Sequence, residues 1–270
     1  LFFFTQTTAY AIRLSLVGSE MCIRDSFYDI HILKSIIMKT VILAGGYGTR
    51  LAEYTDKIPK PMVQIGDKPI LSHIMNFYQS FGYDEFIIAA GYKQNVIKEY
   101  YKNLKEFKNI KIVDTGEDTM TGGRILRLKS YFNKNENFFM TYGDGLCSIN
   151  LESLTQFHIS HKKIATVTAV HPPVRFGELE IDGDDVTKFE EKPQASAGWI
   201  NGGYFILNSN VFDYIDNDKT LFEKEPMTNL SKDKNLKAFK HEKFWKCMDT
   251  LRDKIDLEKI LKGQGTIWKK

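Results

Sequence analysis

Four charged residues stand in settings suited to binding phosphate and a metal ion. Arg50 closes a glycine-rich segment, and Lys60 lies between two prolines. Asp144 stands between two glycines, and Asp249 precedes the last helical pattern of the chain. Cations and main-chain amides bind phosphate oxygens, and carboxylates are ligands that Mg²⁺ prefers. The residue types therefore indicate chemistry on a phosphorylated substrate.

The glycine-rich segment follows an apolar run and suits a loop that contacts an anion. Glycines let the backbone approach a ligand closely, and a threonine hydroxyl and an arginine add donors. No Lys-Ser/Thr pair follows, so the segment is not a P-loop, and Leu51 takes the third glycine position of the dinucleotide fingerprint. A tight turn with a solvated arginine explains the segment equally well. Its residues are Leu43, Ala44, Gly45, Gly46, Tyr47, Gly48, Thr49 and Arg50.

Lys60 is held between Pro59 and Pro61, which stiffen the chain on both sides. Fixing a cation in this way costs conformational freedom unless an anion makes use of it. An exposed turn lysine is the alternative for this segment taken alone. Next to the glycine-rich segment, however, a phosphate-binding lysine is the better interpretation.

Both aspartates could be metal ligands, and both have an ordinary alternative. Asp144 follows a predicted buried strand, and open α/β sheets bind ligands at the carboxyl ends of their strands. Asp-Gly is also a common turn pair. Asp249 could instead cap the last helix, a role that Thr250 could equally fill. Spacing alone leaves these alternatives open.

Short apolar runs alternate with helical patterns from Met38 onward. This alternation predicts an α/β fold with a Rossmann-like, mixed but mainly parallel sheet. Asp182-Gly-Asp-Asp185 is a hairpin signal and predicts a small antiparallel β excursion over 177–191. The predicted strands are 40–44, 86–90, 110–113, 138–142 and 165–169, and the predicted helices are 69–81, 94–101, 123–132, 151–161 and 250–262.

Composition excludes several classes of protein. With 270 residues, 43% of them hydrophobic, the chain can bury a core in one large domain, and we assign that domain to 38–270. A net charge of +3 does not indicate a nucleic-acid or membrane surface, and no run of about 18 apolar residues predicts a membrane span. Three widely spaced cysteines argue against structural zinc and favour a reducing, cytoplasmic location. Residues 1–37 are predicted to be a non-native or disordered leader.

The glycine-rich segment, followed by Pro59-Lys-Pro-Met62, resembles the sugar-nucleotide pyrophosphorylases. Further segments narrow the resemblance to the glucose-1-phosphate cytidylyltransferase family, a group with a Rossmann-like nucleotidyltransferase fold. These segments are Asp114 to Arg124, Thr141 to Gly145, Pro172 to Gly177, Glu191 to Pro193, Asn201 to Gly203 and Met248 to Asp253.

The resemblance implies that the chain transfers CMP from CTP to glucose 1-phosphate, giving CDP-glucose and pyrophosphate with Mg²⁺. It implies that Asp144 and Asp249 hold the metal, and that Arg50 and Lys60 act with Asp144 in catalysis. A homo-oligomer is also possible. The remaining substrate-binding residues that it implies are Thr119, Arg124 and Gly143 for the nucleotide, Glu191 and Lys192 for the sugar and its phosphate, and Asn201 and Gly202 lining the pocket.

The chain departs from the family in two places. Only Lys102 to Asn109 join a predicted helix to the next strand, where better-known members carry a longer insertion, and Cys247 replaces a proline. The alternatives are therefore a nucleotidyltransferase that uses another nucleoside triphosphate or sugar 1-phosphate, and a non-catalytic homologue that binds nucleotide sugars. The presence of all four charged residues favours an enzyme.

Overall fold

The computed structural model describes residues 38–102, 104–172, 178–190 and 198–268. The predicted leader 1–37 lies outside the described residues, as do Glu191 and Lys192. The compact unit considered below comprises Met38–Lys270. No helix in its described part is long and apolar enough to cross a membrane.

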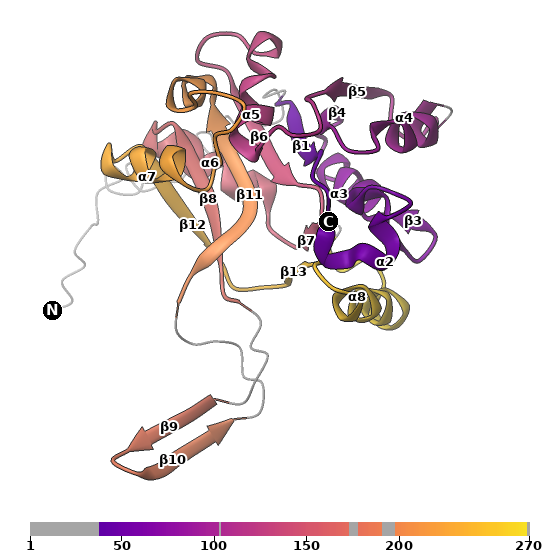
Figure 1. Cartoon of the computed structure of the whole chain (residues 1–270). Helices are drawn as coiled ribbons and strands as arrows, with labels where there is room; N and C mark the ends of the chain where they lie inside the picture. Colours follow the sequence, from indigo (N-terminus) through magenta and orange to yellow (C-terminus); the bar gives the residue numbers. More distant parts are fainter. Residues whose placement is uncertain (1–37, 103, 173–177, 191–197, 269–270) are drawn as a thin grey trace, which may run out of the picture. The chain divides into compact units, whose positions relative to one another are not determined.

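A seven-stranded mixed sheet forms the centre of this unit (Figure 1). Among its strands only β11 runs opposite to its neighbours, because it pairs antiparallel with both β6 and β8. The predicted α/β fold with a mainly parallel sheet is confirmed. In spatial order the strands are β12 (Leu236–His241), β8 (Ala165–Val170), β11 (Ile200–Asn208), β6 (Asn137–Tyr142), β1 (Thr40–Ala44), β4 (Glu85–Ala90) and β5 (Asn109–Asp114).

β1 lies in the middle of the sheet because its sequence is apolar on both faces. Its five residues, Thr40 to Ala44, are all buried, and it pairs in parallel with β4 and β6. A strand buried on both faces lacks the polar alternation of a surface strand. The glycine-rich segment begins at the carboxyl end of this strand, where parallel sheets present their ligand sites.

Helices cover both faces of the sheet and give three layers. On one face, α3 (Ile70–Gln79) places Tyr78 against Phe139 of β6. On the opposite face, Phe205 of β11 packs against Phe222, within the apolar cluster that includes Ile125 of α5 (Thr121–Leu126). The remaining helices include α4 (Gln94–Lys102), α6 (Leu151–His161), α7 (Glu225–Lys232) and α8 (Leu251–Gln264).

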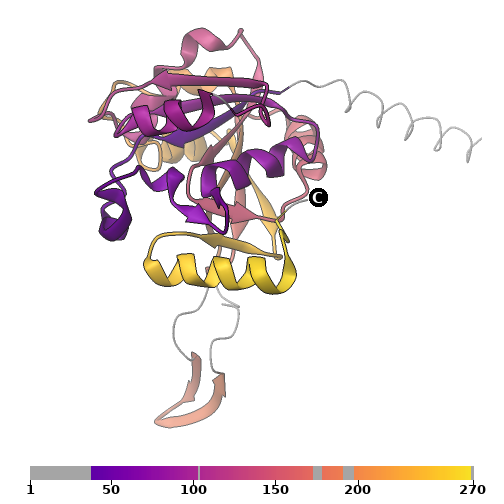
Figure 2. The same cartoon turned by 90° about the vertical axis from the view of Figure 1, so that its right-hand side faces the viewer.

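Three short pairings complete the fold at its margins. β7 (Gly145–Cys147) pairs antiparallel with β13 (Trp245–Cys247), and β2 (Gln64–Ile65) pairs with β3 (Lys68–Pro69). α8 packs against β2 and β13, and Figure 2 shows it, in yellow, lying along one end of the sheet. The predicted antiparallel excursion is a hairpin of β9 (Glu178–Asp182) and β10 (Asp185–Glu190).

Two predicted helices differ from the observed ones. The prediction of one helix over 123–132 is wrong: α5 ends at Leu126, and a separate 3₁₀ turn covers Lys129–Tyr131. Between them, the amide of Leu128 donates to the carbonyl of Ile125, three residues back, at 3.0 Å, so the last turn has tightened and the α-helix has ended. The helix predicted from Pro69 begins at Ile70, because Pro69 has the extended conformation of an N-cap residue.

Candidate active site

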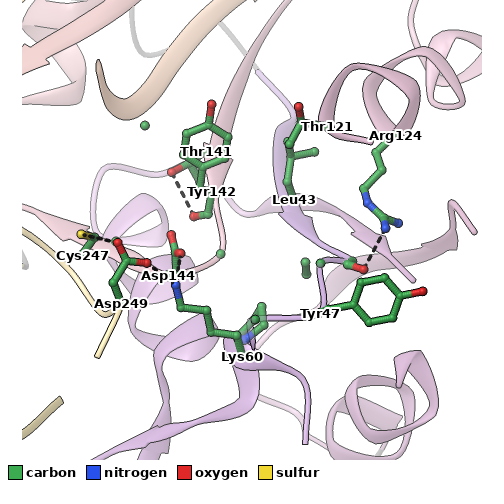
Figure 3. Close-up of a pocket in the computed structure, with 18 of the residues that line it drawn as sticks. Leu43, Tyr47, Lys60, Thr121, Arg124, Thr141, Tyr142, Asp144, Cys247 and Asp249 are labelled. Atoms are coloured by element: carbon green, nitrogen blue, oxygen red, sulfur yellow. Dashed lines mark hydrogen bonds and ion pairs between the residues drawn. The ribbon is translucent and has the colours of Figure 1, made fainter. Parts of the chain in front are cut away.

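A cavity of about 810 Å³ opens beyond the carboxyl ends of β1 and β6 (Figure 3). It brings together every predicted site residue that the structure describes. They are Leu43, Ala44, Gly45, Gly46, Tyr47, Gly48, Thr49, Arg50, Lys60, Thr119, Arg124, Gly143, Asp144, Asn201, Gly202 and Asp249.

Lys60 joins the two aspartates at the centre of this cavity (Figure 3). Its ammonium nitrogen Nζ lies 2.6 Å from Oδ2 of Asp144 and 2.7 Å from Oδ1 of Asp249. Arg50 donates to the other oxygen of Asp249, Oδ2, at 2.8 Å. Because the Lys60 side chain is only 12% exposed, water screens these contacts less than those of Arg50, which is 75% exposed.

Asp249 reaches Asp144 through a strand pairing between distant segments. β13 pairs antiparallel with β7, and the amide of Met248 donates to the carbonyl of Asp144 at 2.8 Å. The helix cap does not use Asp249. Thr250 is the N-cap of α8 and forms a capping box with Asp253, so the side chain of Asp249 faces the cavity.

Opposite charges set the protonation of this cluster. Burial favours neutral Lys60, but Asp144 and Asp249 outweigh it and raise its pKa above the ordinary value. Burial also acts to raise the pKa of Asp249, but Lys60 and then Arg50 lower it below the ordinary value. Burial, followed by the charges of Asp249 and Asp144, raises the pKa of Cys247 to about 12. Near neutral pH, Lys60 is therefore a cation, Asp249 a carboxylate and Cys247 a neutral thiol.

Glycines at the site allow close packing around Lys60. A β-carbon on Gly143 would lie 2.9 Å from a ring carbon of Pro61, and one on Gly48 would lie 2.9 Å from Cβ of Lys60. Gly48 also has φ +66°, in the left-handed region that favours glycine. Pro61 therefore packs closely against Gly143, the residue before Asp144, and this contact restricts the position of Lys60.

The glycine-rich segment lines the cavity and has main-chain amides without a hydrogen-bond partner among the described residues. Gly46, Tyr47 and Thr49 are exposed. Within the described part of the chain, no hydrogen bond uses the amides of Gly46, Tyr47 or Gly48. Neighbouring free amides in a glycine-rich turn suit an anion.

Arg124 lies behind this segment with its guanidinium directed at the protein backbone. Its side chain donates to the carbonyls of Gly45, Gly116 and Glu117 at 2.6 to 2.9 Å and to the hydroxyl of Thr115. The residue is 3% exposed. A β-carbon on Gly45 would lie 2.1 Å from the guanidinium of Arg124, so a glycine at this position leaves the room that the arginine side chain needs. The described geometry gives Arg124 the task of holding the segment in place.

Three hydrogen bonds at the site had no signal in the sequence. Tyr142 donates its hydroxyl to Glu223, and Thr121 donates to the other carboxylate oxygen of Glu223. Tyr47 donates to Asp118 at 2.7 Å. The residues of each pair are 71 to 102 positions apart, so no local motif could have revealed the contacts.

The two aspartates fit a hard divalent cation. Their oxygens converge on one atom, the ammonium of Lys60, so the two carboxylates can contact a common centre. No cluster of three His, Cys, Asp or Glu side chains suited to a metal occurs among the described residues. Mg²⁺ commonly takes one or two protein carboxylates and completes its shell with water and substrate phosphates, so this donor set is compatible with it.

Comparisons with known proteins agree with the geometry. The profile of the family described as Nucleotidyl transferase matches residues 39–259. Glucose-1-phosphate cytidylyltransferase of Salmonella typhi is 46% identical, the match covering 86% of this chain and 99% of that protein. A probable glucose-1-phosphate cytidylyltransferase of Bacillus subtilis is 41% identical over the same shares. The crystal structure of HddC from Yersinia pseudotuberculosis superposes with a TM-score of 0.66 at 28% identity, covering 83% of this chain and 99% of HddC.

Proposed function

Because the chain belongs to the nucleotidyl transferase family, we propose that it transfers CMP from CTP to glucose 1-phosphate, releasing pyrophosphate. The proposal rests on the ion-paired cluster of Lys60 with Asp144 and Asp249, which lines the same cavity as the glycine-rich segment. The choice of cytosine and glucose is supported by relatives of that name that match the chain at 41 to 46% identity.

The reaction is an in-line displacement. A phosphate oxygen of glucose 1-phosphate forms a bond to the α-phosphorus of CTP, and the bond from that phosphorus to the bridging oxygen breaks. The electron pair leaves with pyrophosphate. The attacking oxygen is already ionised near neutral pH, so the step needs neither a protein nucleophile nor a general base.

The residues at the site act by charge and position. The free amides of the glycine-rich segment bind the triphosphate, and Arg50 and Lys60 neutralise charge as it builds on the leaving oxygen. Asp144 and Asp249 would hold Mg²⁺, which when bound supplies a positive centre for the phosphates. Thr119, Gly143, Asn201 and Gly202 would line the substrate pocket, and Glu191 and Lys192 would contact the sugar phosphate.

The mass of the product tests this proposal. Purified protein with CTP, glucose 1-phosphate and Mg²⁺ should give CDP-glucose and pyrophosphate in equal amounts. The panel includes UTP, dTTP and GTP, and also other sugar 1-phosphates. Fast turnover with UTP and none with CTP would refute the assignment of the base. Nucleotide binding without turnover of any pair would support the non-catalytic alternative.

Asp144→Asn tests the metal site within the same assay. The neutral amide keeps the shape of the side chain but loses the charge that a divalent cation requires. We expect a loss of at least about 100-fold in kcat, and a loss of metal-dependent nucleotide binding measured by calorimetry. Glu152→Gln on the surface of α6 is the matched control. An unchanged rate in Asp144→Asn would contradict its role.

A further inference from the structure

Tyr142 and Glu223 form a contact at the cavity wall that the reaction described above does not use. Tyr142 ends β6, and its hydroxyl donates to Oε1 of Glu223 at 2.5 Å. Thr121, at the start of α5, donates to the other carboxylate oxygen at 2.6 Å. Tyr142 and Thr121 both line the cavity (Figure 3). Glu223 therefore joins two elements of the wall through their hydroxyl groups.

The direction of these hydrogen bonds follows from the groups involved. An ionised carboxylate has no proton and only accepts, so the proton of each hydroxyl points at Glu223. The amide of Phe222 donates to the hydroxyl oxygen of Thr121 at 2.9 Å, which leaves the Thr121 proton for Glu223. Burial, and then the charge of Glu223, raise the pKa of Tyr142 above its ordinary value, so the phenol stays protonated near neutral pH. The oxygen of Tyr142 can therefore only accept a further hydrogen bond.

Asn201 supplies that further hydrogen bond. Its amide nitrogen Nδ2 donates to the hydroxyl oxygen of Tyr142 at 3.5 Å, and its oxygen Oδ1 accepts from the amide of Gly203 at 2.8 Å. A main-chain amide only donates, and the Tyr142 oxygen only accepts, so both neighbours require the same orientation of the Asn201 side chain. One contact alone would let the amide plane rotate about the bonded atom. The two contacts together fix it.

Packing holds the ring of Tyr142 where its hydroxyl meets both partners. Gly203 has φ +77°, and a β-carbon on it would lie 2.6 Å from a ring carbon of Tyr142. The ring also packs edge-to-face with Phe205, with 6.0 Å between the ring centroids. A register shift in β11 between Asn201 and Phe205 accompanies this close approach. Packing thus sets the position of the ring, and Glu223 sets the direction of its hydroxyl.

Asn201 retains one donor and one acceptor for a ligand. A side-chain amide has two N–H groups and two lone pairs on its oxygen, and the contacts above use one of each. No other hydrogen bond of this side chain occurs among the described residues. Asn201 is exposed and lines the cavity. A donor beside an acceptor suits a hydroxyl group, which both accepts and donates.

The place of Asn201 in the sheet separates it from the phosphate-binding residues. Tyr204 of β11 pairs with Thr141 of β6, so Asn201 lies beyond the carboxyl end of β6. β11 is two strand spacings, roughly 10 Å, from β1, and the glycine-rich segment follows β1. With the triphosphate at that segment, the side of β11 is left for the hydroxyl groups of the sugar phosphate.

We propose that Tyr142 and Glu223 are positioning residues, which orient the amide of Asn201 toward one hydroxyl group of the sugar phosphate. The inference rests on the proposed function, because that function brings a sugar into the cavity. Glu223 holds the proton of Tyr142, and Tyr142 accepts from Asn201. The oriented amide then favours sugars that carry a hydroxyl at the position it meets.

Tyr142→Phe tests the orientation of Asn201. The ring remains, but Asn201 loses its acceptor. With the sugar 1-phosphate that the wild type turns over best, we expect KM for the sugar phosphate to rise at least about fivefold. KM for the nucleotide should not change. Tyr214→Phe is the matched control, because Tyr214 also accepts from an asparagine, Asn235, and donates to a carboxylate, Asp233, and none of the three lines the cavity. Tm should change equally in the two variants. An equal rise in both KM values, or a rise in neither, would overturn the proposal.

Two substitutions at Glu223 separate positioning from a purely structural link between elements. In Glu223→Gln the amide oxygen still accepts from Tyr142, so KM for the sugar phosphate should stay within about twofold of the wild-type value. Glu223→Leu offers no acceptor and should raise this KM as Tyr142→Phe does. Combining Glu223→Leu with Tyr142→Phe should be no worse than the larger single effect, since both act through one contact. Losses that add up in the double variant would contradict this arrangement.

Deoxy analogues of the sugar 1-phosphate identify the hydroxyl that Asn201 meets. Analogues that each lack one hydroxyl are compared in the wild type, Asn201→Ala and Tyr142→Phe. We expect one analogue to lose at least about tenfold in kcat/KM with the wild type and much less with both variants. If every analogue lost equally with all three proteins, the proposal would be wrong although the enzyme is active. A wild type that forms no nucleotide sugar from any pair in the panel would instead refute the proposed function, and this inference with it.

Discussion

Lys60 occupies the position at which a cation would contact both Asp144 and Asp249. A divalent ion that binds the free protein must therefore displace the ammonium group. Phosphates of a nucleotide offer Lys60 and Arg50 another anionic partner, so nucleotide and metal should favour each other's binding. This coupling would arise from four side chains alone.

We predict that Lys60→Met separates metal binding from turnover. The variant removes the competing charge and leaves two neighbouring carboxylates, so Mn²⁺ alone should bind at least tenfold more tightly, about 1.4 kcal/mol, in calorimetry without nucleotide. Turnover should fall by about 100-fold or more, because a cation that stabilises the leaving charge is lost. Lys68→Met, which breaks the surface pair with Glu106, is the control. Equal Mn²⁺ affinity in wild type and Lys60→Met would contradict the competition.

The charges of Lys60 and Asp249 also set the pH range over which these residues stabilise the fold. The pKa of Asp249 is lowered on folding, so its contribution to stability is present above its unfolded pKa and is lost as pH falls through the folded value. The pKa of Lys60 is raised, so its contribution is present below its unfolded pKa and is lost as pH rises through the folded value. Between these limits, both residues remain charged.

At the scale of the elements, Arg124 connects α5 to the glycine-rich segment. Arg124→Lys keeps the charge but cannot reproduce the fork of donors to Gly45, Gly116 and Glu117. The charge-assisted hydrogen bonds of the guanidinium would be lost, at about 1.5–3 kcal/mol in the free energy of unfolding. We expect a lower midpoint in urea and a raised KM for CTP. Arg127→Lys, whose arginine bonds the exposed Asp218, is the control. A raised KM with unchanged stability would point to direct contact with nucleotide.

A second element-scale prediction concerns α6 and β8. His158 is 3% exposed and shares the hydroxyl of Thr166 with His161. Burial, and then the neighbouring His161, lower its pKa from 6.5 to about 4. The unfolded chain therefore takes up this proton first as pH falls. The stability contributed by neutral His158 is complete above pH 6.5 and declines toward pH 4, by about 3 kcal/mol.

His158→Asn should reduce this acid sensitivity. The amide can still bond to Thr166 but cannot take up the proton, so unfolding free energies measured in urea should change less between pH 6.5 and 4 than in the wild type. His171→Asn, at a partly exposed position, provides the comparison. If both variants followed the wild-type slope, burial of His158 would not be the cause.

The elements also show how far sequence reasoning extends. Strands with continuous apolar runs, such as Thr40–Ala44, were predicted correctly because burial on both faces leaves a plain pattern. β11 was missed because glycines interrupt its apolar residues. The position of Asp144 at a strand end could be inferred locally. Its closeness to Asp249 depends on the pairing of β7 with β13, which no local pattern specifies.

The direction of a side chain was harder to predict than its place. Arg124 was predicted to contact the nucleotide. It does line the cavity, but its donors turn to backbone carbonyls that come from two other segments. An arginine at this position in the sequence could equally bind a nucleotide or bond to backbone carbonyls. Only the carbonyl positions, which the tertiary fold sets, distinguish them.

For the whole molecule, we predict that a chain beginning at Met38 retains the activity of the full chain. Every described site residue and the family match lie within Met38–Lys270, which forms one compact unit. The shortened protein should have the same Tm in calorimetry and the same kcat. A fall in either quantity would mean that residues 1–37 contribute to folding or to the site.

The β7–β13 pairing has a consequence for synthesis of the protein. The ribosome produces the glycine-rich segment, Lys60 and Asp144 well before Asp249. A nascent chain that stops short of residue 245 lacks the strand that delivers the second carboxylate. Such a fragment would contain the glycine-rich segment, Lys60 and Asp144 but not Asp249. Under the proposed role of Asp249 in holding the metal, a prematurely terminated chain would be inactive, and CTP would be consumed only by chains translated past Asp249.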